Sequence, residues 1–464
     1  MSDTMSDMMP ASFAAGGDRL LDGMFATPAT LAALGDRGRL DAMLRFEVAL
    51  AEAQAALGLV PAEAARVIAG CADPDAFAIP DLAAAAARAG NIAIPFVSAF
   101  TALVARRDAA AARYVHWGAT SQDVIDTATV LQLRAAVHAC RVDLLRLETG
   151  LAMMVEAHAA TVLPGRTWLQ HAVPTTLGLK AAGWLTALSA ARREVDAAVG
   201  RAACLQFGGA AGTLASLGGR GLEIARGMAM RLDLRLPALP WHTLRGELAG
   251  CGGALGVLCG VLGKLARDLS LMMQTEIAEL LPPGGKGQGG SSTMPHKRNP
   301  VGCAIALSVA TQAPGLVATL MAAMVQEHER GLGGWHAEWQ TLPALLRLTA
   351  ASAAQMAATV DGMEIHPLAM QADLGRTHGL MMAEAVSMEL ARGIGKEAAH
   401  HVLEEASRTA LARGVGLEQV LKQDDRVTGA LSAEAIAHLM DPAHYLGNAK
   451  EFCARAVQAW RGGE

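Results

Sequence analysis

The chain has 464 residues, of which 52% are hydrophobic and only 4% are aromatic, and its formal net charge is −5. This length supports more than one hydrophobic core, and the near absence of alternating β-branched and aromatic residues favours a mainly helical protein. The negative charge argues against a nucleic-acid partner held through counterion release, although a local cationic pocket stays compatible with it.

The chain begins with residues 1–18, which carry acidic residues and lack the basic and then apolar pattern of a secretion signal. We expect this segment to be a disordered lead-in. The first strong periodicity follows it, because Leu40, Leu44, Val48 and Ala51 mark one face of a helix.

The first polar segment in the alanine-rich background is His116-Trp117-Gly118-Ala119-Thr120-Ser121-Gln122-Asp123. Thr120 and Ser121 could bind a ligand at a helix start. Alternatively, with Asp123, they could simply cap the helix that follows. The second polar segment spans residues 165–174 and interrupts the helical pattern. Its Arg166 and Gln170 could be functional or could be solvated turn residues.

A leucine-rich seam predicts a long central helix. Its apolar residues recur in steps of three and four: Leu255, Leu258, Leu262, Leu265, Leu269 and Met272. Such a seam requires partner helices, from the same chain or from another subunit, so we expect a central bundle.

The third polar segment runs from Gly289 to Pro300 and is the most informative part of the chain. Its glycines let backbone amides approach a ligand closely. Asn299 and Pro300 are typical of a helix start, where free N–H groups favour an anion, and Lys297 and Arg298 add positive charge. This combination suits a small polycarboxylate substrate handled by an activated serine.

Residues 301–326 contain no charged residue, and this uncharged run is long enough to span a bilayer. Thr311, Gln312 and Pro314 interrupt the run, and no aromatic belt marks its ends. We predict a helix buried in a large bundle and no membrane partner.

The breaks between helical stretches divide the chain into three predicted domains, which are an N-terminal helical domain (1–115), a central helical bundle (116–364) and a C-terminal helical domain (365–464). The seven cysteines include no CxxC pair, as is typical of proteins in a reducing compartment, so we expect a cytoplasmic protein.

Motifs for cofactors and metals fail on spacing. The glycines at 284–287 lack the order of a phosphate-binding loop, and those between 208 and 219 follow no predicted strand. His328 and Glu329, with His336 and Glu338, do not match HExxH. We therefore expect neither a cofactor nor a metal.

Together, the three polar segments resemble the signature regions of the fumarase/aspartase superfamily, and Ser-Ser-x-Met-Pro-x-Lys-x-Asn-Pro is complete from Ser291 to Pro300. The resemblance implies an all-α, three-domain subunit with a central long-helix bundle. It also implies a homotetramer whose active sites are each built from three subunits. In that family, a serine at the position of Ser291 moves the proton on the carbon next to a substrate carboxylate, through a doubly charged aci form.

The chain also departs from the family pattern. Most lyases of the family carry a histidine where this chain has Trp168, and a glutamate that orients it where this chain has Ala304. Loss of both members argues against reactions whose leaving group needs that dyad. The pattern resembles the cycloisomerase branch, in which a carboxylate of the substrate itself closes a lactone ring and only one proton has to move.

The resemblance implies a small tricarboxylate substrate and a set of site residues. The candidate catalytic residues are Ser291, Lys297, His116 and His171. The candidate substrate-binding residues are Thr120, Ser121, Arg166, Trp168, Gln170, Arg245, Ser292, Met294, His296 and Asn299. Arg298 is instead expected to pair with an acidic neighbour. Two alternatives stay open, which are an adenylosuccinate lyase-like C–N lyase and a catalytically silent relative that keeps the fold.

Overall fold

The computed structural model describes residues 19–284, 289–290, 294 and 297–463. It confirms the all-α class, because the strands within these ranges form only two small two-stranded sheets. The contacts divide the chain into two compact units, each built from separate stretches of sequence. The three-domain division stays a prediction. The expectation for residues 1–18 lies outside the described residues.

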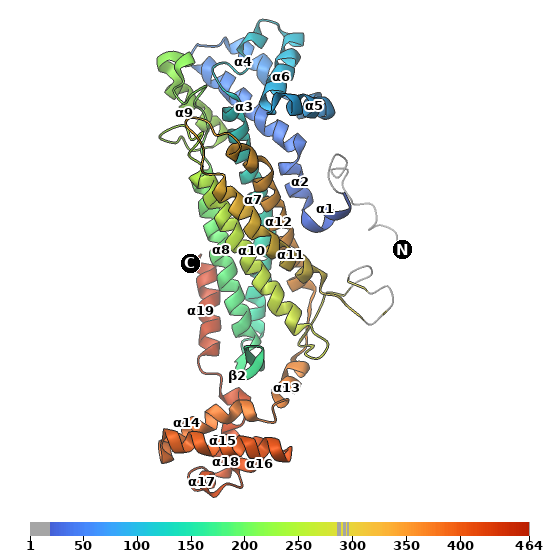
Figure 1. The fold of residues 1–464 in the computed structure, drawn as a ribbon, viewed down its shortest axis with the longest axis vertical. Coiled ribbons are helices and arrows are strands. Elements are labelled where there is room, and N and C mark those ends of the chain that lie inside the picture. The colour runs from blue at the N-terminus through green and yellow to red at the C-terminus, as the bar shows by residue number, and fades with distance from the viewer. Residues whose placement is uncertain (1–18, 285–288, 291–293, 295–296, 464) are drawn as a thin grey trace. The chain divides into compact units, whose positions relative to one another are not determined.

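Unit 1 comprises residues 1–144, 191–263 and 305–355. Its short helices, 3₁₀ helices included, are α1 (Arg19–Phe25), α2 (Pro28–Leu34), α3 (Asp36–Ala56), α4 (Ala62–Gly70), η2 (Pro74–Ala76), α5 (Ile79–Ala89), α6 (Ala93–Arg107), η3 (Ala111–Tyr114), η4 (Ala215–Arg220) and α9 (Gly221–Leu232). Helix α3 packs against α4 and α9, and α5 packs against α6 (Figure 1).

The long helices contribute residues to both units. They are α7 (Ser121–Ala157), α8 (Leu177–Ala202), α10 (Gly246–Met272), α11 (Val301–Ala322) and α12 (Gly334–Gly362). The predicted seam on α10 is confirmed, since its five leucines and Met272 are all buried. In unit 1, α10 and α11 approach closely, because a Cβ on Gly256 would lie 2.8 Å from Cγ2 of Val317.

Unit 2 comprises residues 145–190, 264–304 and 356–464. Its other elements are β1 (Val162–Thr167), β2 (Gln170–Thr176), β3 (Leu280–Leu281), β4 (Glu364–Ile365), α13 (Pro367–Gly375), η5 (Leu380–Met382), α14 (Ala383–Ile394), α15 (Lys396–Arg413), α16 (Leu417–Leu421), α17 (Asp425–Thr428), α18 (Ala433–Leu439), η6 (Pro442–His444) and α19 (Ala449–Gly462). Helices α14 and α15 pair with each other (Figure 1). Strand β1 contacts α13.

The break predicted around residues 163–174 contains an antiparallel hairpin. Strands β1 and β2 pair from Val162 opposite Thr176 to Thr167 opposite Gln170, so only Trp168 and Leu169 form the turn. Both turn residues have positive φ, 52° and 65°. Neither is glycine, asparagine or aspartate, the residues that usually mark such a turn, and the sequence therefore carried no hairpin signal.

Two helices, α10 and α11, are long and apolar enough to cross a membrane by length and composition alone. Burial distinguishes them, because 61% of the most apolar window is buried in α10 and only 28% in α11. The expectation that residues 301–326 form a helix buried on all sides is therefore wrong for a single chain. Helix α11 presents an uncharged and largely exposed surface.

Candidate active site

The first polar segment is anchored by the buried carboxylate of Asp123. Its oxygens accept hydrogen bonds from the backbone N–H groups of Gly208 and Gly209, both at 2.9 Å, and from that of Thr120 at 3.1 Å. His242 Nε2 lies 2.9 Å from the same carboxylate. Thr120 and Ser121 are thereby held at the start of α7, against the loop that contains Gly208 and Gly209.

His116 precedes this helix start and pairs with a second buried carboxylate. Its Nδ1 atom lies 2.6 Å from Oε1 of Glu47, whose side chain is only 1% exposed. Burial lowers the pKa of His116, but the charge of Glu47 and the hydrogen bond to it outweigh burial, so the pKa is raised above its ordinary value. The pair favours an imidazolium beside the Thr120 segment.

Arg330 completes this part of the site, and sequence reasoning did not find it. Its guanidinium donates to Oγ1 of Thr120 at 3.3 Å and to the carbonyl of Ala210 at 2.9 Å. Among the described residues, no carboxylate pairs with it. The signal in the sequence was an arginine in the charged stretch 327–330, which follows the uncharged residues 301–326. In the described ranges, no group of three or more His, Cys, Asp or Glu side chains could hold a metal ion.

The second polar segment lies on the β1–β2 hairpin. Arg166 makes a two-pronged ion pair with Glu279, with both N–O distances at 2.9 Å, and lies 3.5 Å from Asp373. Glu279 is fully buried, and burial raises its pKa although Arg166 opposes the shift. The charge of Arg166 is therefore balanced by carboxylates of the protein, and these ion pairs hold the hairpin in position.

His171 and Trp168 occupy different environments on this hairpin. Nδ1 of His171 is buried and finds no partner among the described residues, and burial together with the nearby Arg166 lowers its pKa. Trp168 is 98% exposed at the turn. The expectation that Trp168 contacts the substrate therefore requires a surface that a single chain does not supply. Gln170, next to the turn, is also exposed.

The third polar segment is described only in part. Ser291, Ser292 and His296 lie outside the described residues. The ends of the loop are joined, because the N–H of Asn299 donates to the carbonyl of Gly289 at 2.8 Å and Gly290 pairs with Arg298. Helix α11 begins just after Pro300, close to the predicted start.

The two cations of this segment differ in their surroundings. Nη1 of Arg298 lies 2.8 Å from Glu364, which confirms the expected pairing with an acidic neighbour. Lys297 is exposed, and no described carboxylate pairs with it. Met294 is exposed as well. Lys297 is therefore the cation of this loop that stays available to an anionic ligand.

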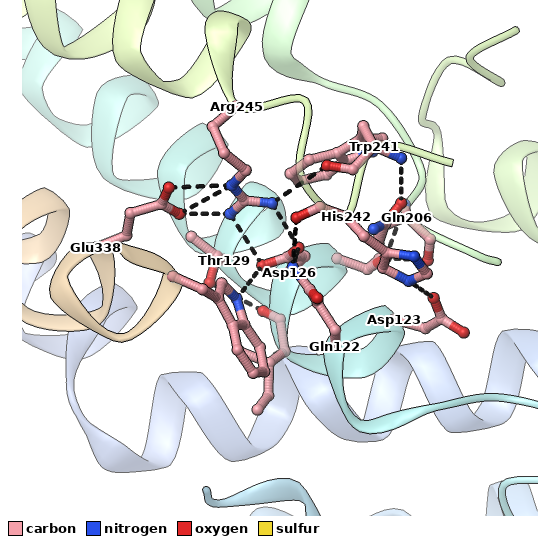
Figure 2. Close-up of polar contacts among 12 residues, drawn as sticks. Gln122, Asp123, Asp126, Thr129, Gln206, Trp241, His242, Arg245 and Glu338 are labelled. Atoms are coloured by element: carbon pink, nitrogen blue, oxygen red, sulfur yellow. Dashed lines mark hydrogen bonds and ion pairs between the residues drawn. The ribbon is translucent and has the colours of Figure 1, made fainter. Parts of the chain in front are cut away.

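Arg245, which we expected to bind a substrate carboxylate, is buried between two carboxylates of the protein. Figure 2 shows its guanidinium between Asp126 and Glu338, with Nη1 2.7 Å from Oδ2 of Asp126 and Nε 3.0 Å from Oε1 of Glu338. The ring of Trp241 lies 4.7 Å away on another side. These partners occupy the guanidinium, so the structure assigns Arg245 to joining α7 to α12.

Comparison with known proteins agrees with the three-segment pattern. Residues 24–315 match a family model described as lyase, and residues 379–456 match one described as adenylosuccinate lyase C-terminus. A 3-carboxy-cis,cis-muconate cycloisomerase of Bradyrhizobium diazoefficiens is 50% identical over 95% of this chain and 98% of its own length. One of Pseudomonas aeruginosa is also 50% identical, over 95% of this chain and 96% of its own length.

A solved structure gives the same result. The 3-carboxy-cis,cis-muconate lactonizing enzyme from Pseudomonas putida matches with a TM-score of 0.92 at 46% identity. The match covers 96% of this chain and all of that one. The similarity therefore extends over both compact units of the chain.

The Arg245 cluster yields a prediction about stability. Replacing Arg245 with Gln leaves two buried carboxylates without their cation, which should cost about 3–5 kcal/mol in the free energy of unfolding. Urea denaturation followed by circular dichroism measures this. Arg66→Gln is the control, since it breaks an exposed ion pair with Glu63 and should cost less than about 1 kcal/mol. Equal losses in the two variants would contradict a structural role for Arg245.

The His116–Glu47 pair yields a prediction about pH. In Glu47→Gln the carboxylate is gone while burial persists, so the pKa of His116 should fall. NMR titration of labelled histidines measures it, with His116→Asn identifying the signal. Because the folded-state pKa is raised, the stability from the pair is fully present below the unfolded value of about 6.5. It is lost as pH rises through the folded value, so the stability difference between wild type and variant should shrink there.

Proposed function

Since the chain belongs to the fumarase/aspartase superfamily of lyases, and within it to the family of the bacterial 3-carboxy-cis,cis-muconate cycloisomerases, we propose that it converts 3-carboxy-cis,cis-muconate to 4-carboxymuconolactone. The observation that carries this proposal is the 50% identity to relatives of that name over almost their entire length. The reaction belongs to protocatechuate breakdown toward 3-oxoadipate.

The residues at two positions support the same reaction. Trp168 and Ala304 stand where related lyases carry a histidine and its glutamate, and neither can transfer a proton. Lactonisation does not need that pair. A carboxylate oxygen of the substrate attacks the conjugated double bond, the carbon–oxygen bond forms, and the electron pair moves toward another carboxylate to give an aci anion.

One proton then completes the product. In our proposal the hydroxyl of Ser291 delivers it to the carbon next to the carboxylate, and solvent later restores the serine. Lys297 and backbone amides of the glycine-rich loop would stabilise both the alkoxide and the aci anion. The described ends of that loop, Gly289 and Asn299, are hydrogen-bonded to each other.

We assign the substrate carboxylates to two groups of residues. Thr120, Ser121 and Arg330 form the first, because Arg330 touches Thr120 and lacks a described acidic partner. Lys297 and Asn299 form the second, with Ser292, Met294 and His296 beside them. His116 and His171 are candidates for moving protons or contacting carboxylates. Gln170 and Trp168 are expected to line the site from the hairpin turn, and Arg166 to position that hairpin. Arg245 is left out.

We further propose a cytoplasmic homotetramer in which three subunits build each site. Two apolar features of one chain support this assembly, namely the exposed side of α11 and the exposed Trp168. All seven cysteines are free thiols, in agreement with a reducing compartment, and cell fractionation tests the location.

The assembly predicts a solution mass. Light scattering on the purified protein should give four times the mass of one chain. Ala318→Asp, which puts a charge on the exposed side of α11, should lower the mass. Arg408→Asp on the exposed surface of α15 is the control and should leave it unchanged. A single-chain mass for the wild type would exclude shared sites.

Two of the sequence matches are compatible with a different lyase. The C-terminal match to adenylosuccinate lyase, and a nitrosuccinate lyase of Streptomyces davaonensis that is 42% identical over 92% of this chain, are compatible with a C–N lyase. A catalytically silent relative is the other alternative. Ultraviolet assays separate the three, because loss of muconate, formation of an unsaturated dicarboxylate by C–N cleavage and absence of turnover give different signals.

The activity prediction uses the same assay. Purified protein incubated with 3-carboxy-cis,cis-muconate should consume it and form the lactone, identified by mass and NMR. Ser291→Ala should lower kcat by about two to four orders of magnitude, since removal of a positioned proton donor has effects of that size. Ser292→Ala is the matched control and should lose far less.

Arg330→Gln should raise KM more than it lowers kcat, because it removes a carboxylate contact rather than the proton donor. Near-normal turnover in Ser291→Ala would refute the role of that serine. Absence of muconate consumption by the wild type would refute the proposed reaction.

A further inference from the structure

Unit 1 contains a cavity of about 370 Å³ that the proposed reaction does not use. It lies among α3, α5, α7 and α12, and its apolar wall includes Leu34, Met43, Ile125, Leu342 and Leu346. Neither Thr120 nor Arg330 lines it. Its size is within the range of small-molecule sites in proteins.

The two acidic groups in its wall, Asp126 and Glu338, share one arginine and accept further hydrogen bonds from neutral donors. Asp126 accepts hydrogen bonds from Arg245 and from Nε2 of Gln122 at 3.0 Å (Figure 2). It also accepts one from Nε1 of Trp335 at 2.9 Å. Glu338 is paired with the same arginine. The oxygens of these carboxylates are therefore already hydrogen-bonded within the protein.

Two donors in the wall lack partners. Arg39 lines the cavity, and no carboxylate within the described ranges forms an ion pair with it. Burial lowers the pKa of its guanidinium, and Asp36 offsets only part of that cost. Nε1 of Trp339 is buried and has no hydrogen-bond partner in the described part of the chain.

The indole is also held in place. Its ring centroid lies 4.9 Å from that of Trp335, at 84°, and 4.5 Å from that of His336. A buried N–H without an acceptor costs free energy, and so does the partial burial of a cation that has no ion-pair partner. An occupant that brings an anionic acceptor would remove both costs.

The remaining polar groups are used locally. Gln132 donates to the carbonyl of Ala33 at 2.8 Å, and the hydroxyl of Thr129 donates to the carbonyl of Ile125 at 2.9 Å. The amide oxygen of Asn91 accepts from the N–H of Ile94 at 3.2 Å. The cavity thus combines Arg39, the indole N–H of Trp339 and the hydrogen-bonded Asp126 and Glu338 with a large apolar wall.

We propose that this cavity is a second ligand site, which binds a small monocarboxylate with an apolar body, its carboxylate on Arg39 and Trp339 and its body against the leucine and isoleucine wall. A tricarboxylate does not fit this description, because one cation cannot compensate three charges in an apolar cavity. The site is therefore distinct in chemistry from the proposed active site, and it does not depend on the proposed reaction.

Calorimetric titration of the full chain with 3-phenylpropionate tests the proposal. We expect saturable binding that weakens about tenfold or more in Arg39→Gln, since a hydrogen bond to a charged group is lost. Trp339→Phe, which keeps a ring and removes the N–H, should weaken binding by a smaller factor. The neutral probe 3-phenylpropionamide should bind the wild type as poorly as the carboxylate binds Arg39→Gln.

Arg37→Gln is the matched control, because Arg37 lies on the same helix, pairs with Asp75 at 2.6 Å and does not line the cavity. It should bind like the wild type. Ala86→Leu, which fills part of the cavity from α5, should abolish binding while circular dichroism shows an intact fold. No saturable binding to the wild type overturns the proposal.

The same titration distinguishes the cavity from the proposed active site. Arg330→Gln should bind the probe like the wild type if the carboxylate lies on Arg39. If Arg330→Gln loses binding and Arg39→Gln keeps it, the probe occupies the other site and the proposal is wrong.

Discussion

Asp123 and Asp126 lie almost one turn apart at the start of α7, and both carboxylates are buried. Buried carboxylates must be compensated, and each of these finds a different partner set. Asp123 takes two glycine amides and His242, while Asp126 takes Arg245, Gln122 and Trp335. The partners of Asp123 hold the Thr120 segment against the loop that contains Gly208 and Gly209, and the partners of Asp126 join α7 to α12.

The pairing of carboxylates with cations also divides the arginines and lysines of the site into two functional groups. Arg245, Arg166 and Arg298 each face a carboxylate of the protein. A cation that is neutralised in this way has little left to offer a carboxylate ligand. Arg330 and Lys297 have no such partner among the described residues. This contrast is the physical basis for assigning them, rather than the paired arginines, to the substrate.

Particular residues show how far sequence reasoning reached. The seam from Leu255 to Met272 was recognisable because burial of a helix face follows a period that the sequence displays directly. The hairpin at 162–176 was not, since its turn residues are Trp168 and Leu169, and its pairing depends on strands too short to show alternation. Arg245 was assigned to a ligand because a sequence does not reveal that Glu338 lies across from it.

The sequence by itself determined the helical class and the superfamily, and the missing histidine and glutamate motivated the proposed lactonisation. These inferences rest on residue identity within short motifs, or on periodicity along one helix. Only the tertiary structure decided which charges are neutralised, because the partners of Arg245, Arg166 and Arg330 lie 93 to 210 positions away along the chain. Pairing over such separations is set by helix packing. The same packing places Arg39 and Trp339 in the wall of a cavity that no sequence motif indicated.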